Sequence, residues 1–314
     1  YPRTTNAPTF SIVQWNILAD GLAQNGDFIK VDPGCLEWDY RLPLLLSELQ
    51  EANADIICMQ ELNHFDDLKQ HLEPLGYQAA GFLPKHCSPA ARYKCAPDGL
   101  AIFYKASSFR VASPAKGQYF LDESGETSSQ GYLHVVLEHA RDASKRLVVA
   151  TTHLKAKEGE DMDQIRLRQM TQLLSGLASE MELLQPQSNG NGSNGNGSGR
   201  GHSNGSSSSS GSNGPTKRSP VLITGDFNAV PGSAPCKALQ AHPVRFKSLW
   251  DVAAGGNGVM RPRASSPHAY VETFSSGGSL DAAELSQQQQ QGEGNGDGAG
   301  SSMDAGAGSS SMDA

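Results

Sequence analysis

The chain has 314 residues, a net charge of −8 and five cysteines. Residues 186–218 and 275–314 consist almost entirely of small and polar residues, and such segments bury too little apolar surface to offset the entropy of ordering. Residues 10–274 suffice for one domain of ordinary size, after a lead-in at residues 1–9. The acidic balance argues against a general nucleic-acid coat protein, and no apolar run reaches membrane-spanning length.

The cysteines are scattered and form no Cys-x-x-Cys pair that would indicate zinc or redox chemistry. We therefore expect reduced thiols and an intracellular, cytoplasmic protein. The chain begins at Tyr1 rather than at methionine, so a mitochondrial targeting segment upstream stays an alternative. We predict a disordered loop insertion at 186–218 and a disordered tail at 275–314, and both tracts are candidates for binding other proteins.

Strands and helices alternate in the first third of the chain. Residues 38–52 repeat apolar side chains at helical spacing, whereas residues 56–61 form a continuous apolar run typical of a strand covered on both faces. In chain order we predict strands at 10–18, 56–61, 77–82 and 98–105, and helices at 38–52 and 64–75. The segment 84–97 is basic and includes Lys85. It is either a plain surface loop or a loop over an anionic ligand, and the sequence favours the two interpretations equally.

Residues 131–138 and 147–152 are predicted to form a pair of strands. The strongest helix spans 161–184, where Asp161 can cap the first turn together with Gln164. We interpret its apolar stripe as core and expect Arg166 and Arg168 to face solvent. A short helix at 234–240 and a last strand at 269–274 follow.

The segment 220–231 (PVLITGDFNAVP) combines a buried strand with polar residues at its end. Gly225 allows a turn or a close approach of the backbone. If the chain stays extended, Asp226 and Asn228 lie on one side, because side chains alternate with period two. They can accept a proton and orient a phosphate or a water. Taken alone, Asp-x-Asn more often marks only a strand followed by an Asx-turn.

Several other strand ends carry a polar side chain of the same kind. The set consists of Asn16, Glu61, His153, Asp226 and Asn228. Strand ends on one edge of a sheet converge in layered α/β proteins, so we expect these residues to meet in a crevice. An acid such as Glu61 then suits a hard cation. The set has no Ser or Cys nucleophile with partners, and it favours metal-assisted attack of water on phosphorus.

At this point the chain resembles the endonuclease/exonuclease/phosphatase superfamily. The resemblance rests on QWNIL at 14–18, QE at 60–61, DGLAIF at 98–103, THLK at 152–155 and GDFN at 225–228, in that family's order. Within the superfamily, the chain is most similar to the carbon-catabolite-repression deadenylase-like branch, and within that branch to the nocturnin type. This narrower similarity rests on the fuller WNILA start, LEW at 36–38, LGYQ at 75–78 and HLKAK at 153–157.

The resemblance implies an α+β fold, also described as an α/β sandwich, with four layers: two face-to-face mixed β-sheets flanked by helices. It implies Mg²⁺ (or Mn²⁺) bound chiefly by Glu61 with help from Asn16. Asp226 would orient or deprotonate the attacking water. Asn228 and His153 would stabilise the phosphate charge. Lys155 and Lys157 match basic positions near the substrate's phosphates.

The implied function is a phosphoesterase acting on the 2′-phosphate of NADP(H), with a 3′-to-5′ poly(A) exoribonuclease acting on the RNA 3′ tail as the alternative. The family's last two motifs, an aspartate strand and a terminal Ser-Asp-His, have no counterpart after Phe274. The last strands of one sheet are therefore expected to be missing. A catalytically dead binding module or truncated fragment is the alternative from another class.

Overall fold

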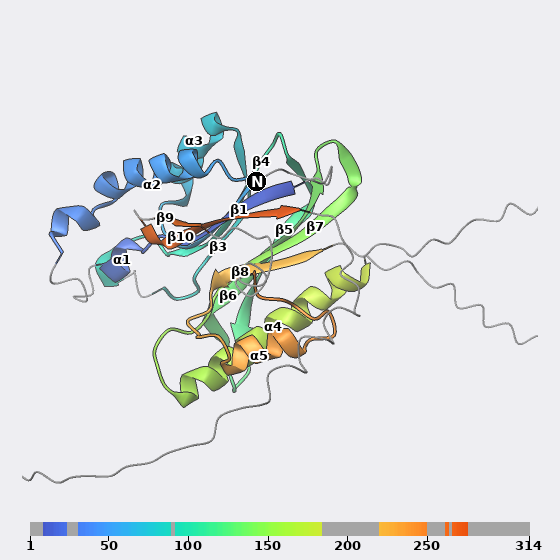
Figure 1. Ribbon diagram of the computed structural model, residues 1–314. Helices are drawn as coiled ribbons and strands as arrows, with labels where there is room; N and C mark the ends of the chain where they lie inside the picture. The colour runs from blue at the N-terminus through green and yellow to red at the C-terminus, as the bar shows by residue number, and fades with distance from the viewer. Residues whose placement is uncertain are drawn as a thin grey trace, which may run out of the picture. The chain divides into compact units, whose positions relative to one another are not determined.

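The computed structural model describes residues 9–23, 31–88, 92–183, 220–249, 261–263 and 266–275 (Figure 1). Thr9–Ser275 forms one compact unit. Its strands are β1 (Thr9–Asn16), β2 (Ile56–Leu62), β3 (Tyr77–Pro84), β4 (Gly99–Lys105), β5 (Phe109–Leu121), β6 (Thr127–His139), β7 (Asp142–His153), β8 (Val221–Asp226), β9 (Arg261–Arg263) and β10 (Ser266–Ser275). Its helices are α1 (Asp20–Ala23), α2 (Trp38–Ala52), α3 (Phe65–Leu72), α4 (Glu160–Leu183) and α5 (Ala234–Ala241), with short 3₁₀ turns η1 (Pro33–Leu36) and η2 (Glu73–Leu75).

The strands form two mixed sheets, as predicted. One sheet has six strands in the order β3-β4-β2-β1-β10-β9, and the other has four in the order β5-β6-β7-β8. β1 pairs with β2 in parallel, and β7 pairs with β8 in parallel, while the remaining pairs are antiparallel. In Figure 1, α2 and α3 cover the first sheet, and α4 and α5 cover the second. The predicted four-layer α+β sandwich is confirmed.

Apolar side chains fill each of the spaces between these layers. Ile56 and Cys58 on β2 face Leu133 and Val149 across the gap between the sheets. The neighbouring residues Ile57 and Met59 point the other way, toward α2 and α3. A third cluster joins the outer face of the second sheet to α4 and α5. β2 is apolar without alternation because both of its faces are buried.

The predicted helix at 38–52 has the observed bounds, although Pro43 lies inside it rather than in its first turn. The helix predicted at 64–75 is α3 followed by η2, and Gly76 closes it with φ +84°, a backbone conformation that suits glycine. The strand predicted at 269–274 is part of β10.

β5 was not predicted, although it is a strand of 13 residues. Pro114 and Gly117 interrupt its sequence, and both residues are depleted from strands. The irregularity has a structural counterpart, since the register between β5 and β6 shifts at several points. Bulges place this strand against β6 without a clean alternation of polar and apolar side chains.

Two predictions about α4 are wrong. The helix begins at Glu160, and the amides of Met162 and Asp163 donate to the carbonyl of Gly159, so Asp161 lies inside the first turn and does not cap it. Arg166 is buried, with only 4% of its surface exposed. Arg168 does lie near the surface, where it pairs with the exposed Glu123.

The lead-in at residues 1–8, the insertion predicted at 186–218 and the tail from 276 lie outside the described residues. Within the part of the chain that is described, no helix has both the length and the apolar character that crossing a membrane requires.

Candidate active site

Strand pairing brings the predicted polar residues to one edge of the two sheets. Asn16 ends β1 opposite Gln60 of the parallel strand β2. His153 ends β7 opposite Asp226, the last residue of the parallel strand β8. Parallel neighbours end on the same edge, so each sheet contributes two adjacent strand ends to the site. Side-chain contacts between the sheets then join the two halves.

The amide of Asn16 connects the two carboxylates of the site. Its Nδ2 donates to Oε1 of Glu61 at 2.8 Å and to Oδ2 of Asp226 at 3.1 Å. Its Oδ1 accepts from the backbone N–H of Leu18 at 3.1 Å, which fixes the orientation of the amide. Asn16 therefore presents donors rather than its oxygen to the acids, and it holds Glu61 of one sheet beside Asp226 of the other.

Glu61 sits at an irregular point of β2. The register between β2 and β4 shifts between Met59 and Leu62, and Glu61 has φ +59°. A non-glycine residue in this left-handed region is uncommon. The bulge turns the side chain toward the sheet edge, where Oε2 accepts from the N–H of Ala19 at 3.1 Å.

His153 lies between the two acids and is 8% exposed. Its Nδ1 is 3.8 Å from Oε1 of Glu61, and its Nε2 is 3.8 Å from Oδ2 of Asp226. Burial, together with the charge of Lys85, lowers the pKa of His153 against the opposing effect of the two acids. Nδ1 is buried and has no hydrogen-bond partner among the described residues. The ring therefore has an unused polar atom directed at the site.

Asp226 follows Gly225, whose φ of +141° is accessible to glycine and strained for other residues. Of the two predicted roles the close approach is confirmed, because a Cβ at this position would lie 2.1 Å from the carbonyl oxygen of Thr152. Oδ1 of Asp226 accepts from the N–H of Asn228 at 3.0 Å, which is an Asx-turn. The chain thus bends after Asp226 instead of staying extended, and Asn228 donates through Nδ2 to the carbonyl of Leu154 at 3.1 Å. Asn228 still joins β8 to the end of β7.

Lys155 and Lys157 lie in the loop that follows β7. The carbonyls of both lysines accept from Nη1 of the buried Arg166, at 2.9 and 2.7 Å. Neither lysine side chain has an ion-pair partner in the described parts of the chain. Arg166 therefore shapes the loop, and no contact ties either ammonium to the Asn16–Glu61–Asp226 group.

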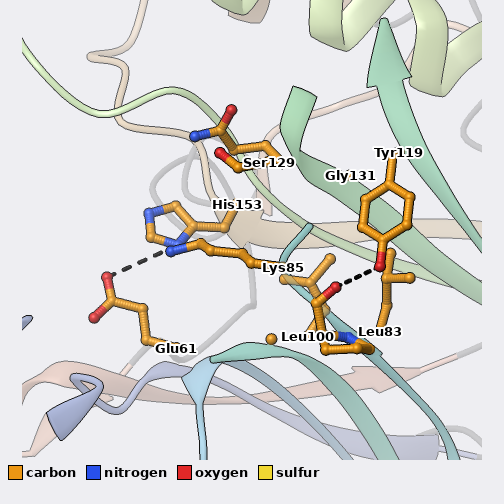
Figure 2. A pocket seen from close by; sticks show the side chains of 11 residues that line it. Glu61, Leu83, Lys85, Leu100, Tyr119, Ser129, Gly131 and His153 are labelled. Carbon is orange, nitrogen blue, oxygen red and sulfur yellow. Dashed lines mark hydrogen bonds and ion pairs between the residues drawn. The ribbon is translucent and has the colours of Figure 1, made fainter. Parts of the chain in front are cut away.

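One ion pair beside the site was not identified from the sequence. Nζ of Lys85 is 2.6 Å from Oδ2 of Asp98, and Asp98 is 1% exposed and also accepts from Ser88 Oγ at 2.9 Å. Lys85 lines a pocket with Glu61 and His153, and in Figure 2 its side chain extends toward the histidine ring. The loop 84–97 thus places a cation at the site. The sequence offered two signals, the basic loop 84–97 and the DGLAIF motif at 98–103, but neither predicted that Lys85 and Asp98 would pair.

The far side of this pocket is formed by the second sheet. Tyr119 and Gly131 line it, and the Tyr119 hydroxyl donates to the carbonyl of Pro84 at 2.7 Å (Figure 2). These residues come from β5 and β6, so the unpredicted strand β5 contributes directly to the pocket wall.

The donor set suits a sparsely ligated divalent cation better than a protein cage. No group of three or more His, Cys, Asp or Glu side chains that could hold a metal occurs in the described ranges. Glu61 and Asp226, two acids, instead share the neutral donor Asn16. A cation would relieve the repulsion between them. Mg²⁺ is commonly held by one or two carboxylates, with waters and substrate oxygens completing its shell.

Comparison with known proteins agrees with this geometry. The sequence pattern of the Endonuclease/Exonuclease/phosphatase family matches residues 13–281. The chain belongs to this family. The matched region contains every residue of the candidate site, from Asn16 to Asn228.

Nocturnins are among its most similar relatives, as the resemblance predicted. The chain is 35% identical to Nocturnin of Xenopus laevis over an aligned region of 175 residues. This region covers 54% of this chain and 44% of that protein. It is 28% identical over 234 residues to Protein angel homolog 2 of Danio rerio, covering 71% of this chain and 34% of that one. The chain therefore spans less than half the length of these family members.

Solved structures of the family have the same fold. The human Nocturnin catalytic domain with bound sulfate has a TM-score of 0.60 at 23% identity, over 85% of this chain and 82% of that one. ANGEL2, described as a 2′,3′-cyclic phosphatase and bound to adenosine-2′,3′-vanadate, has a TM-score of 0.57 at 23% identity, over 75% and 58% of the two chains.

Proposed function

We propose that this protein is a divalent-metal phosphoesterase that cleaves a phosphate ester by attack of water. The observation that carries the proposal is the single Asn16 amide that holds Glu61 and Asp226 together, with His153 within 3.8 Å of both acids. The two acids can share a cation, and the histidine beside them, with its lowered pKa, can move a proton. Membership of the family supports the same reaction class.

Glu61 is the proposed main ligand of Mg²⁺ or Mn²⁺. When bound, the metal supplies charge that stabilises the developing negative charge on the phosphate oxygens. Asn16 orients Glu61 in the arrangement described. It becomes a ligand itself if Oδ1 exchanges the N–H of Leu18 for the cation, as the family resemblance implies.

Asp226 accepts the proton of the attacking water at its carboxylate. Its Oδ1 is fixed by the N–H of Asn228, which leaves Oδ2 on the side of Asn16 and His153. His153 directs its unused Nδ1 into the site, where it can donate to a phosphate oxygen. Asn228 positions the end of β8 and, on rearrangement, offers its amide to the phosphate.

A small nucleotide is the proposed substrate, with the 2′-phosphate of NADP(H) the specific candidate. Lys85 already lies beside His153 and is anchored by Asp98, so a phosphate can bind it without a new ordering cost. Lys155 and Lys157 are proposed to contact further phosphates of the same molecule. The net charge of −8 disfavours a long polyanion, which places the poly(A) tail second.

The decisive experiment compares substrates on the purified chain. Phosphate release from NADPH is measured beside shortening of a poly(A) oligonucleotide, each with Mg²⁺ and with EDTA. We expect metal-dependent phosphate release from NADPH that Glu61→Gln abolishes and that the surface variant Glu123→Gln retains. Shortening of the oligonucleotide without release from NADPH would select the exoribonuclease, and inactivity on both would refute the proposed function.

A further inference from the structure

The loop that follows β1 and runs into the first residue of α1, residues 17–20, supplies backbone groups that hold both proposed metal-binding side chains. The N–H of Leu18 donates to Oδ1 of Asn16, and the N–H of Ala19 donates to Oε2 of Glu61, each at 3.1 Å. Because Oδ1 of Asn16 is occupied in this way, its Nδ2 faces Glu61. The path of the loop thus sets the directions in which the Glu61 oxygens and the Asn16 amide point.

Arg41 of α2 holds this loop in place. Its Nη1 donates to the carbonyls of Ile17 and Leu18, both at 2.8 Å, and its Nη2 contacts Oδ1 of Asp20 at 2.5 Å. Its Nε donates to the carbonyl of Leu36 at 2.9 Å. The loop needs such support, because Leu18 has φ +63°, an unfavourable conformation for a residue of this size.

Asp20 has a second partner that connects it to the segment after Glu61. Its Oδ2 is 2.5 Å from Nε2 of His64, which precedes α3. The His64 ring stacks on Trp38 at a centroid distance of 4.3 Å, and the guanidinium of Arg41 lies over the same indole at 5.7 Å. The arginine, the acid and the two rings form one braced unit against α2.

We propose that Arg41 and Asp20 are positioning residues, which hold the 17–20 loop so that the N–H of Ala19 orients Glu61 toward a divalent cation while the N–H of Leu18 keeps the Asn16 amide between Glu61 and Asp226. The inference rests on the proposed function. Neither residue is assigned a contact with substrate. A lysine at position 41 keeps the charge, but its single ammonium lacks the planar fork that serves several acceptors at once. The alternative is that Arg41 only fastens α2 to the domain.

Measuring Mn²⁺ binding distinguishes a positioning role of Arg41 and Asp20 from a role in the stability of the domain alone. The dissociation constant is measured by electron paramagnetic resonance of free Mn²⁺ for wild type, Arg41→Gln, Arg41→Lys and Asp20→Asn. The matched control is Leu49→Val, which shrinks a core residue of the same helix that is 1% exposed. We expect the Mn²⁺ dissociation constant to rise about tenfold or more in Arg41→Gln and by a smaller factor in Arg41→Lys and Asp20→Asn. In Leu49→Val it should not change. Thermal unfolding confirms that each variant is folded.

Hydrogen exchange tests the loop without any metal. Amide exchange over residues 17–20 is expected to accelerate in Arg41→Gln and to stay unchanged in Leu49→Val. Wild-type Mn²⁺ affinity in Arg41→Gln, or equal losses in Leu49→Val, would overturn the proposal, as would unchanged exchange in the loop. If wild type binds no Mn²⁺ while exchange still responds, the metal assignment of the proposed function fails and the loop-positioning role is upheld.

Discussion

Gln60 on β2 donates through Nε2 to Oγ1 of Thr151 on β7 at 2.9 Å, a hydrogen bond that crosses from one sheet to the other. Both residues are completely buried. Gln60 immediately precedes Glu61, and Thr151 lies two residues before His153. A buried polar contact between otherwise apolar layers has a strong preference for one alignment, because every other alignment leaves a polar group unpaired. The contact thus fixes the distance between the two halves of the candidate site.

Thr151→Val is expected to impair the site more than the fold. The change conserves shape but leaves Nε2 of Gln60 without its acceptor, which costs about 1–3 kcal/mol of unfolding free energy. We expect kcat/KM to fall by about tenfold or more, since small displacements of reacting groups are costly. Urea unfolding and steady-state kinetics measure the two effects. Thr152→Val is the control, because Thr152 Oγ1 bonds to Gly131 within one sheet; an equal loss of activity there would contradict the prediction.

Asp226→Asn is expected to lower turnover rather than substrate affinity. Asparagine can still accept from the N–H of Asn228 through its oxygen, so the turn after β8 is retained, while the proton acceptor is lost. We expect kcat to fall by about 10²–10⁴-fold with little change in KM, as for removal of a general base. Initial rates over a range of substrate concentrations give both constants. A change confined to KM would exclude the assigned role.

Gly225→Ala is expected to destabilise the domain strongly. A Cβ at this position would overlap the carbonyl oxygen of Thr152, and φ is +141°. Strain and overlap together should cost about 3 kcal/mol or more. Gly125→Ala is the control, because Gly125 has φ +84° but open space around its would-be Cβ, and we expect a cost of about 1 kcal/mol there. Equal costs in urea unfolding would show that the close approach is unimportant.

The stability of the domain is expected to fall on mild acidification through His134. The residue is 5% exposed, and its ring stacks on Tyr132 and faces Glu180, which itself pairs with Lys116. Burial lowers the pKa of His134 from 6.5, although Glu180 opposes the shift. The unfolded chain therefore binds the proton more readily than the folded one. The contribution of neutral His134 to the unfolding free energy is fully present above the unfolded pKa, and it is lost as pH falls from there through the folded pKa.

Melting temperatures between pH 7.5 and 5.5 test this directly. His134→Gln removes the titration, so its melting temperature should vary less with pH than that of the wild type. His71→Gln is the control, because the His71 side chain is 44% exposed and we expect it to leave the wild-type slope unchanged. A slope for His134→Gln as steep as that of the wild type would assign the acid sensitivity to other groups.

Much of the fold, and the meeting of the candidate site residues at one sheet edge, could be predicted from local pattern. Asn16, Glu61, His153 and Asp226 each end an apolar run, and runs that end in a polar residue are visible in sequence because strand cores exclude such side chains. Their convergence also follows from general rules of sheet topology. The hydrogen bond from Asn16 to Asp226 joins the two sheets, and the His153 ring lies 3.8 Å from Glu61 of the other sheet.

The features that sequence missed depend on partners far along the chain. Arg166 looks like a surface residue of α4, and only the carbonyls of the loop after β7 explain its burial. Lys85 and Asp98 become an ion pair only once β3 and β4 are adjacent. Glu61 owes its direction to a bulge, and β-bulges have little sequence signature. Such contacts follow from tertiary packing, which local periodicity does not encode.

The hydrogen bond between Asn16 and Asp226 closes a span of 210 residues. Contacts this remote in sequence form late, because the entropy of closing large loops must be offset first by other structure. The Asn16 amide on β1 can therefore contact both Glu61 and Asp226 only after β8 has joined the second sheet. During refolding, catalytic competence should thus appear with the last cooperative phase rather than with early helix formation, so that recovered activity reports on the complete domain.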